Sequence, residues 1–236
     1  MRNLEQVSHP SLLAAPYYRI DLPKIPPEYE SETLLAVLPS SPPPLRREVE
    51  RFAYYFRREF RYDFVQFDAG KAAASDLEHC TYDTDSSYTA YLFADGEERA
   101  ETNGHMFWVG AGCFRIRQYE NLDNLPVEVF DWAWIHPYFR SRGILGSHWK
   151  RLRRRHGDFL MWQTPFSPTV RKFALQNQKD SIWYPIYEGK EPDWAAIRAK
   201  LKAASSALTQ PRPGTSPEAC AGDIQASPCD ALPDQM

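Results

Sequence analysis

The sequence predicts a mixed α/β (α+β) domain with a central, mostly antiparallel sheet flanked by helices. Two observations lead to this class. The chain has 236 residues, of which 43% are hydrophobic and 14% aromatic, enough for one substantial core and too many for a wholly disordered chain. Along the chain, a helical pattern is followed by several strand patterns and then by alternating helix and strand patterns.

The two ends of the chain differ in composition from its middle. Nine of the 20 prolines fall between Pro10 and Pro44, so residues 1–44 are predicted to form an irregular, proline-rich N-terminal arm. Residues 205–236 contain five more prolines and carry a net charge of −3, from one arginine against four acids. This composition predicts a disordered acidic C-terminal tail. The domain itself is therefore expected to span residues 45–204.

The first half of the domain reads as one helix followed by strands. From Leu45 to Phe60, apolar residues recur at threes and fours with arginines around them, which predicts an amphipathic helix. Alternating patterns then predict strands at residues 62–67, 88–93, 106–116 and 127–135. The last of these is apolar on both faces, so we expect it in the centre of the sheet.

Glycines punctuate these strands, while residues 70–86 are polar and carry no clear pattern. Turns at Asp95-Gly96 and Asn103-Gly104 favour an antiparallel meander. Gly110 and Gly112 lie inside a strand, where glycine marks a bulge or a close approach of two backbones.

The second half alternates helices with short strands. A helix is predicted at residues 145–155 and a short buried strand at 159–163. Ser167 can cap a helix whose first position is Pro168 and which runs to about Asn177. Residues 182–187 resemble a late edge strand because Pro185 interrupts them, and helical spacing resumes from Trp194.

Neither a metal site nor a membrane segment is predicted. No pair of the four cysteines has the short spacing of a zinc knuckle or a redox motif. The set His79, Cys80, His105 and Cys113 is too irregular to indicate zinc. The N-terminus has no apolar signal region, and no apolar run approaches the ~20 residues of a membrane span. A soluble cytoplasmic protein without a metal is the expectation.

A glycine turn and a basic helix follow directly after the strand at 127–135. The stretch from Arg140 to Arg155 holds seven cations and no acid. The free N–H groups at the start of such a helix, together with its dipole, make an anion site. Gly143 lets the backbone approach a ligand, and Arg140 and Arg142 add charged donors, so we predict a phosphate or diphosphate ligand. Neither the P-loop pattern nor the dinucleotide fingerprint is matched.

At this turn the sequence resembles the GCN5-related N-acetyltransferase (GNAT) superfamily. Its motif, Arg/Gln-x-x-Gly-x-Gly/Ala, lies between the fourth strand and the third helix and holds the pyrophosphate of acetyl-CoA. Arg140-Ser-Arg-Gly143-Ile-Leu145 matches the first two anchors and departs at the third, where Leu145 precedes Gly146. The resemblance covers residues 107–187, about a third of the chain. Residues 164–173 are also faintly similar to cohesin acetyltransferases, without indicating a substrate.

The resemblance implies a GNAT-like fold that uses acetyl-CoA as cosubstrate. In that fold the fourth and fifth strands diverge, and the pantetheine arm lies between them, here between 127–135 and 159–163. An acceptor amine attacks the thioester directly after its proton is removed. The residues that would then contact the cosubstrate are Ile135, Arg140, Ser141, Arg142, Gly143, Ile144, Leu145, Gly146 and Phe173.

The resemblance also suggests proton-transfer groups. The base is often a carboxylate on the fourth strand, and strand alternation favours Asp131, on the face of Ala133 and Ile135. Glu128 is the second candidate and would face the other side. The usual acid is a tyrosine on the helix after the fifth strand. That position is Ala174, which leaves Tyr138, Tyr184 or water to protonate the leaving thiolate.

Plainer interpretations stand beside these. The basic run from Lys150 to Arg155 is a solvated helix face unless it contacts the 3′-phosphate of CoA or an acidic substrate. Asp131 is otherwise a buried acid paired with Arg115 or Arg117 on the neighbouring strand. His136 is otherwise a strand-end histidine bonded to backbone. The aromatic residues and arginines of 52–61 form a core-facing helix rather than a base-stacking surface.

The sequence therefore predicts an N-acetyltransferase that moves acetyl from acetyl-CoA to a primary amine, on a protein or a small molecule. One alternative is a non-catalytic protein of the same fold that binds CoA or a partner. Another is a nucleic-acid-associated protein that uses the basic helix, which the neutral charge of residues 1–204 disfavours. The acceptor and the oligomeric state stay open, with a homodimer among the options.

Overall fold

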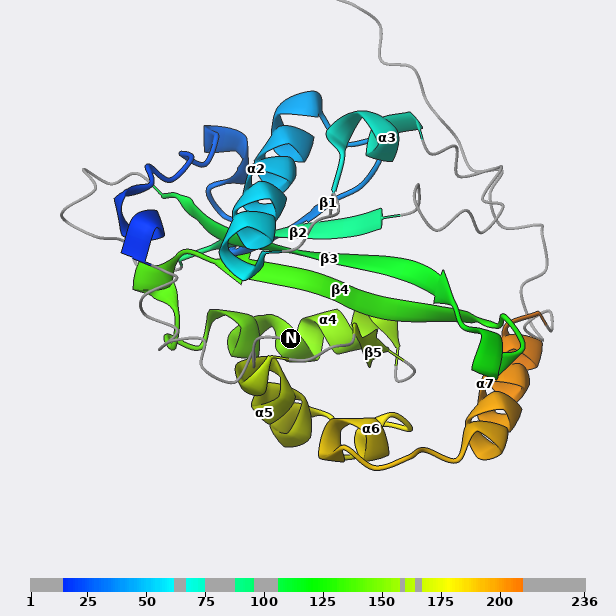
Figure 1. The fold of residues 1–236 in the computed structure, drawn as a ribbon. Helices are drawn as coiled ribbons and strands as arrows, with labels where there is room; N and C mark the ends of the chain where they lie inside the picture. The colour runs from blue at the N-terminus through cyan, green and yellow to red at the C-terminus, as the bar shows by residue number, and fades with distance from the viewer. Residues whose placement is uncertain are drawn as a thin grey trace, which may run out of the picture.

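A five-stranded sheet forms the centre of the molecule in this computed structural model, which describes residues 15–61, 67–74, 88–95, 106–157, 160–163 and 167–209. The strands lie in the order β1-β2-β3-β4-β5, so neighbours in sequence are neighbours in space (Figure 1). They are β1 (Leu34–Val37), β2 (Tyr88–Ala94), β3 (Trp108–Gln118), β4 (Pro126–Ile135) and β5 (Met161–Trp162).

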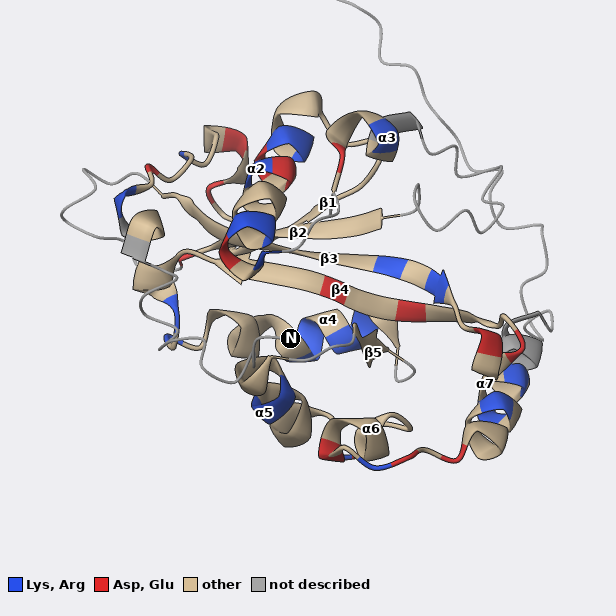
Figure 2. Ribbon diagram, viewed as in Figure 1, with Lys and Arg blue, Asp and Glu red and all other residues tan. Residues whose placement is uncertain are grey.

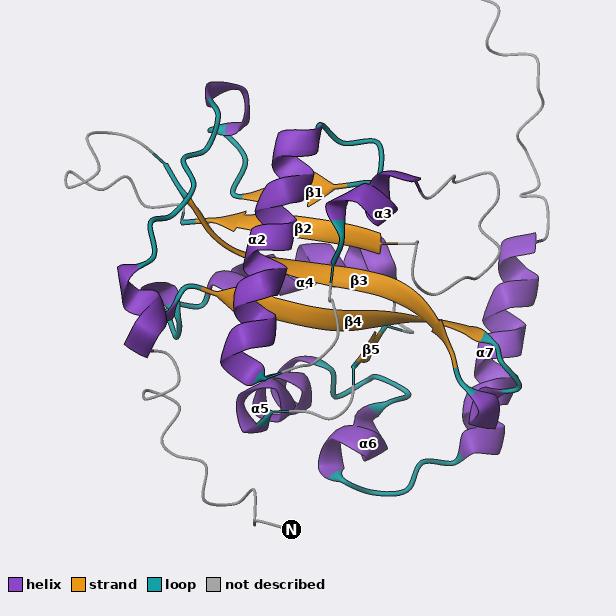
Figure 3. Ribbon diagram, turned by 45° about the horizontal axis from the view of Figure 1, so that its top comes forward, coloured by secondary structure: helices purple, strands orange, loops and turns teal. Residues whose placement is uncertain are grey.

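Helices cover both faces of this sheet. Helices α2 and α3 lie on one face and α4 on the other, with α5 and α6 beyond it, while α7 lies at one end (Figures 1 and 3). Their bounds are α2 (Pro43–Phe60), α3 (Ala69–Ala74), α4 (Ile144–His156), α5 (Pro168–Asn177), α6 (Tyr184–Glu188) and α7 (Trp194–Thr209). The short 3-10 turns are η2 (Ala15–Arg19), η3 (Pro27–Tyr29), η6 (Glu120–Leu122) and η7 (Pro137–Phe139).

The predicted fold class is confirmed. Strands β1 to β4 pair antiparallel in sequence order, and β5 adds a parallel pair to β4. A parallel neighbour needs a crossover connection, which α4 supplies. Strand β1 lies inside the predicted proline-rich arm, where four apolar residues join the sheet through β2.

Most predicted elements appear within a few residues of their expected bounds. The exception is the predicted edge strand at 182–187, which is wrong because the chain forms helix α6 there. Pro185 is the second residue of α6, and the missing N–H of a proline costs nothing in the first turn of a helix. Phe60 was expected in the core but is exposed at the end of α2.

The core has two parts, one on each face of the sheet. Val49 and Phe52 of α2 pack with Trp132 and Trp134 of β4 on the first face. On the second face, Phe130 of β4 packs with aromatic residues of α4 and β5. Because β4 contributes to both clusters, the prediction that it is buried on both faces is confirmed.

Several predictions fall outside the described residues. These are the strand at 62–67 except Phe67, the turns at 95–96 and 103–104 except Asp95, and the tail from residue 210 onward. The division into arm, domain and tail stays a prediction. In the ranges that the structure describes, no helix is both long and apolar enough to cross a bilayer.

Gly110 marks a close approach of β3 to β4, one of the two roles expected for it. A Cβ atom at Gly110 would collide with the Trp134 carbonyl oxygen and lie 2.9 Å from the Ile135 Cα. Both contacts are with backbone, so a side chain here would push β4 away at the end that leads into the turn. Glycine is therefore required at this position.

Replacing Gly110 by alanine is expected to lower the free energy of unfolding by about 2 kcal/mol, because the two strands must separate to admit a methyl group. Urea denaturation of the full chain measures this. Gly146→Ala is the matched control, since its Cβ would meet only the Phe173 ring at 3.9 Å and alanine favours a helix. Equal stability of Gly110→Ala and the wild type would contradict the close approach.

Candidate active site

The chain leaves β4 through a turn that opens directly onto the N-terminus of α4. Ser141 (φ 63°) and Gly143 (φ 77°) both adopt left-handed backbone conformations, and α4 begins at the next residue. The first helical hydrogen bond runs from Ser147 N to Gly143 O (2.8 Å). The amides of Ile144, Leu145 and Gly146 thus precede the helical ladder, and no side chain caps this helix within the described residues.

The space beside this turn is open. A Cβ atom at Gly143 would meet no atom of the described residues within 4 Å. Ser141, Arg142 and Gly143 are all exposed. First-turn amides at the positive end of a helix dipole, with open space beside them, have the chemistry of an anion site.

Arg142 is the arginine that remains available beside the turn. Its guanidinium stacks 4.4 Å from the centre of the Tyr138 ring and 5.3 Å from that of Phe139. The described part of the chain supplies no acidic partner for it. Tyr138 itself is exposed, and its place next to the turn follows from this stacking.

Arg140 lies in the turn, but its guanidinium is paired within the protein, so its expected contact with a diphosphate stays a prediction. Its two terminal nitrogens each donate to a carboxylate oxygen of Glu59 in α2, both at 2.6 Å. Its Nε donates to the Ile135 carbonyl (2.8 Å). All three nitrogens of the guanidinium are therefore committed to the protein itself.

Strand β4 loses its neighbour half-way along. Only Val129 and Phe130 pair with β5, through Met161 and Trp162, and one more bond joins Gln163 N to Phe130 O (3.0 Å). From there to Ile135, no described residue pairs with β4 on the β5 side, although β3 pairs with it along the other side. The geometry fits the expected divergence of the two strands, and it leaves main-chain groups of β4 facing the gap.

An aromatic layer lies on the α4 side of this region. Trp149 of α4 stacks on Trp162 of β5 with ring centres 4.8 Å apart, and Phe173 of α5 packs edge-on against Trp149. The Nε1 atoms of both tryptophans are buried without a hydrogen-bond partner in the described ranges. A buried N–H group without an acceptor costs free energy, so these two donors are unsatisfied within the described part of the chain.

Asp131 lies in a buried ion cluster, which is the alternative that the sequence left open. Its Oδ1 accepts from Arg115 (2.8 Å) and from Arg117 (3.1 Å) on β3. Burial raises the pKa of Asp131 to about 6, while Arg115 acts to lower it. The carboxylate is therefore ionised at neutral pH but shared between two cations, and only Oδ2 lacks a partner among the described residues.

The face predicted for Asp131 is also wrong, because β4 carries a bulge. The pairing register of β3 with β4 shifts between Cys113 and Phe114 and leaves Asp131 without a cross-strand partner. Such an extra residue reverses the alternation of side chains. Asp131 therefore points with Arg115 toward the α2 side, whereas Ala133 and Ile135 pack with the cluster on the α4 side.

Glu128 belongs to a separate cluster. Its Oε1 lies 2.5 Å from Nδ1 of His156, the last residue of α4, whose Nε2 lies 2.8 Å from the Tyr91 hydroxyl. Glu128 is seven residues before Ile135 along β4, roughly 23 Å at the usual rise of a strand. The structure therefore does not bring Glu128 to the turn. Sequence analysis missed His156.

Two further expectations have plain outcomes. His136 is a buried strand-end histidine whose Nδ1 accepts from the Tyr138 amide (3.3 Å), as its plainer interpretation held. Ala174 is fully buried in α5, so no tyrosine hydroxyl is present there.

On α4, an exposed basic face is formed by Lys150, Arg151, Arg154 and Arg155, visible as blue segments in Figure 2.

Glu59 is the residue that sequence analysis missed at the turn itself. Besides Arg140, it accepts a hydrogen bond from Trp134 Nε1 (2.6 Å). A signal was present, since an acid at this position continues the apolar stripe of Phe52 and Phe56 along α2.

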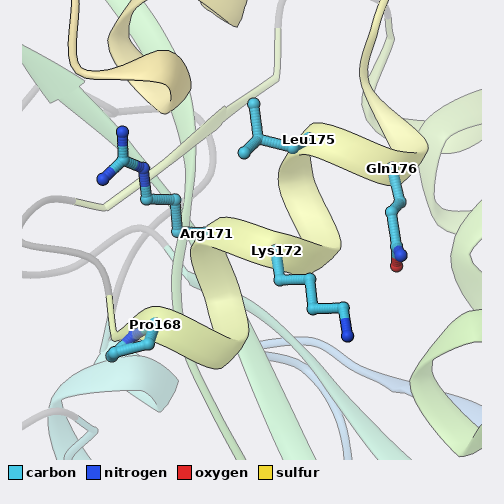
Figure 4. Close-up of a pocket in the computed structure, with 5 residues that line it drawn as sticks. All are labelled: Pro168, Arg171, Lys172, Leu175 and Gln176. Atoms are coloured by element: carbon cyan, nitrogen blue, oxygen red, sulfur yellow. The ribbon is translucent and has the colours of Figure 1, made fainter.

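A surface groove of about 420 Å³ lies elsewhere, on α5. It is lined by Pro168, Arg171, Lys172, Leu175 and Gln176 (Figure 4). Arg171 donates to the Tyr187 carbonyl (2.6 Å), so one of its two cations is engaged in the fold. None of the predicted site residues lines this groove.

No group of three His, Cys, Asp or Glu side chains in the described ranges is placed to hold a metal ion.

Comparison with known proteins finds similar proteins only among solved structures. No family model and no curated protein matches the sequence. Among solved structures, the xEco2 acetyltransferase domain bound to a CoA conjugate is 14% identical, with a TM-score of 0.41, over 62% of this chain and 87% of that one. A ribosomal-protein-alanine N-acetyltransferase from Brucella melitensis biovar Abortus 2308 is 14% identical, with a TM-score of 0.36, over 61% and 88%. At these identities and TM-scores the likeness assigns neither a family nor a role to this chain, so the site is judged on its own residues.

Proposed function

We propose that this protein is an acetyl-CoA-dependent N-acetyltransferase that transfers acetyl to a primary amine. One observation carries the proposal: the half of β4 without a β5 partner leads through η7 into the left-handed turn and the first amides of α4. An extended ligand with a diphosphate at one end requires both parts in this order.

In this proposal, main-chain groups hold most of the cosubstrate. Amides of Ile144, Leu145 and Gly146 bind the diphosphate, and Arg142 adds a side-chain cation at the turn. The edge of β4 from Asp131 to Ile135, which has no β5 partner among the described residues, binds the amides of the pantetheine arm. Phe173 closes the site by packing against Gly146 and Trp149.

The cosubstrate supplies an activated acetyl thioester, and the chain contributes position more than proton transfer. Alignment of an amine with a bound thioester replaces a bimolecular encounter by an effectively unimolecular one. Asp131, Glu128 and Tyr138 lie in separate groups of contacts. No two of them are therefore assigned to the same proton transfer. Asp131 stays a candidate base through its Oδ2 oxygen alone. Otherwise the amine loses its proton to water, and water protonates the thiolate.

A non-catalytic CoA-binding protein is the second candidate. Two observations favour it: the acid position is the buried Ala174, and the carboxylate of Asp131 is shared by two arginines. Both candidates require the same binding site. Release of free thiol in the presence of acceptor amines separates them, because only the enzyme consumes acetyl-CoA.

Acetyl-CoA and CoA are expected to raise the melting temperature of the full chain, whereas ATP at the same concentration should raise it less, because it lacks the pantetheine arm. The control measures the same shifts at 50 and 300 mM salt, where binding through a phosphate backbone alone falls steeply. No shift with either CoA compound at millimolar concentration would overturn the proposal. Thiol release with a panel of lysine peptides, N-terminal peptides and small amines then defines the acceptor class.

A further inference from the structure

An ion pair joins α2 to the turn of the proposed site. Glu59 lies in the last turn of α2, on the face opposite α4, and Arg140 is the first residue of the motif after η7. Their bond is bidentate, with both nitrogen–oxygen distances at 2.6 Å. In Figure 1 the end of α2 reaches β4 at the end of the strand from which the turn departs.

Glu59 is buried, Arg140 is partly buried, and both are held by several hydrogen bonds. The Glu59 side chain is 2% exposed and that of Arg140 is 31% exposed. Glu59 also accepts from Trp134 Nε1 (2.6 Å), and the Arg140 guanidinium lies over the Trp134 ring at 5.7 Å. A planar, bidentate pair of this kind fixes orientation as well as distance. Arg140 therefore cannot turn toward a ligand without breaking three strong hydrogen bonds.

The same guanidinium also holds the end of β4. Its Nε donates to the Ile135 carbonyl, five residues earlier in the chain. The last residue of β4 and the first residue of the turn are thereby fixed to one rigid group. Directly after it, Ser141 adopts a left-handed conformation, which is unfavourable for a residue other than glycine and persists only where the surroundings enforce it.

We propose that Glu59 is a positioning residue, which acts through Arg140 to hold the turn in the conformation that binds the diphosphate. This inference rests on the proposed function. In this proposal Arg140 binds the protein itself and stabilises the turn. Arg142 and the α4 amides contact the ligand. The binding site would thus depend on α2, to which the proposal assigns no contact with the cosubstrate.

Glu59→Gln keeps the shape of the side chain but removes the charge that orients Arg140. We expect CoA to bind about tenfold more weakly to the folded variant, as measured by calorimetry well below its melting temperature, because preorganisation of the turn is lost. Arg140→Gln should have a similar effect. The double variant Glu59→Gln/Arg140→Gln should again lose about tenfold rather than a hundredfold, because the two residues act as one unit.

Glu48→Gln is the matched control. Glu48 pairs with Arg51 on the same helix (3.3 Å) and takes no part in the Glu59–Arg140 ion pair. Its CoA affinity should equal that of the wild type. If Glu59→Gln lowers stability but binds CoA like the wild type, Glu59 is merely structural and the positioning role is overturned while the proposed function stands. A hundredfold loss in the double variant would overturn action through Arg140. A wild type that does not bind CoA overturns the proposed function and this role with it.

Discussion

Replacing Gly143 by aspartate is expected to weaken CoA binding at least 100-fold while the protein still folds. The added carboxylate would enter the open space beside the first turn of α4, where the diphosphate is proposed to lie. Two like charges about 4 Å apart near a protein surface repel by roughly 4 kcal/mol, and each 1.4 kcal/mol is tenfold in affinity. Calorimetric titration of the full chain with CoA measures the loss.

The matched control is Gly143→Asn, which has nearly the same shape without the charge. Asparagine and aspartate both tolerate left-handed backbone better than most residues, so the fold should survive in both variants. The asparagine variant should bind CoA more tightly than the aspartate variant by at least tenfold. Equal affinities of Gly143→Asp and the wild type would show that the diphosphate binds elsewhere.

Sequence patterns predicted those parts of this site that depend on neighbours along the chain. The turn at Gly143 and the helix after it follow from a local succession of strand, glycine and helix former, and the structure has all three in place. The Ser167 cap is equally local, because its hydroxyl accepts from the Val170 amide (3.2 Å). Such interactions are encoded within a few residues and can be read directly.

Contacts between distant segments could not be read in this way. Glu59 and Arg140 are 81 residues apart in sequence, so nothing near Arg140 indicates that its charge is already paired. The motif alone suggested a ligand contact. An acid on the apolar stripe of α2 was the available hint that some buried cation needed a partner.

The bulge in β4 is the reason why the predicted orientation of Asp131 was wrong. Alternation along a strand assigns Asp131 to one side only if the pairing register is continuous. The register shift between Cys113 and Phe114 is a property of the β3–β4 pair and not of β4 alone. As a result, Asp131 lies against Arg115 and not on the face shared by Ala133 and Ile135.

The Asp131 cluster gives the largest expected effect on stability. Arg115→Met should lower the free energy of unfolding by about 3 kcal/mol at pH 8, because a carboxylate with a 1% exposed side chain loses its nearest cation. Methionine retains much of the side-chain volume against Tyr88, over whose ring the guanidinium lies at 5.7 Å. Chemical denaturation of the full chain, at pH 5 and at pH 8, measures the change.

The pH dependence identifies the charge as the cause. In the wild type, burial raises the pKa of Asp131 from 3.8 to about 6, so its unfavourable contribution grows from about pH 4 and is complete soon above pH 6. Without Arg115 the pKa of the folded state rises further, so the variant continues to lose stability as the pH rises toward 8. The destabilisation must therefore be larger at pH 8 than at pH 5. Arg117→Met, whose side chain is 25% exposed and whose bond is 3.1 Å, should show the same trend more weakly. Equal destabilisation by Arg115→Met at both pH values would mean that the arginine contributes packing and not charge.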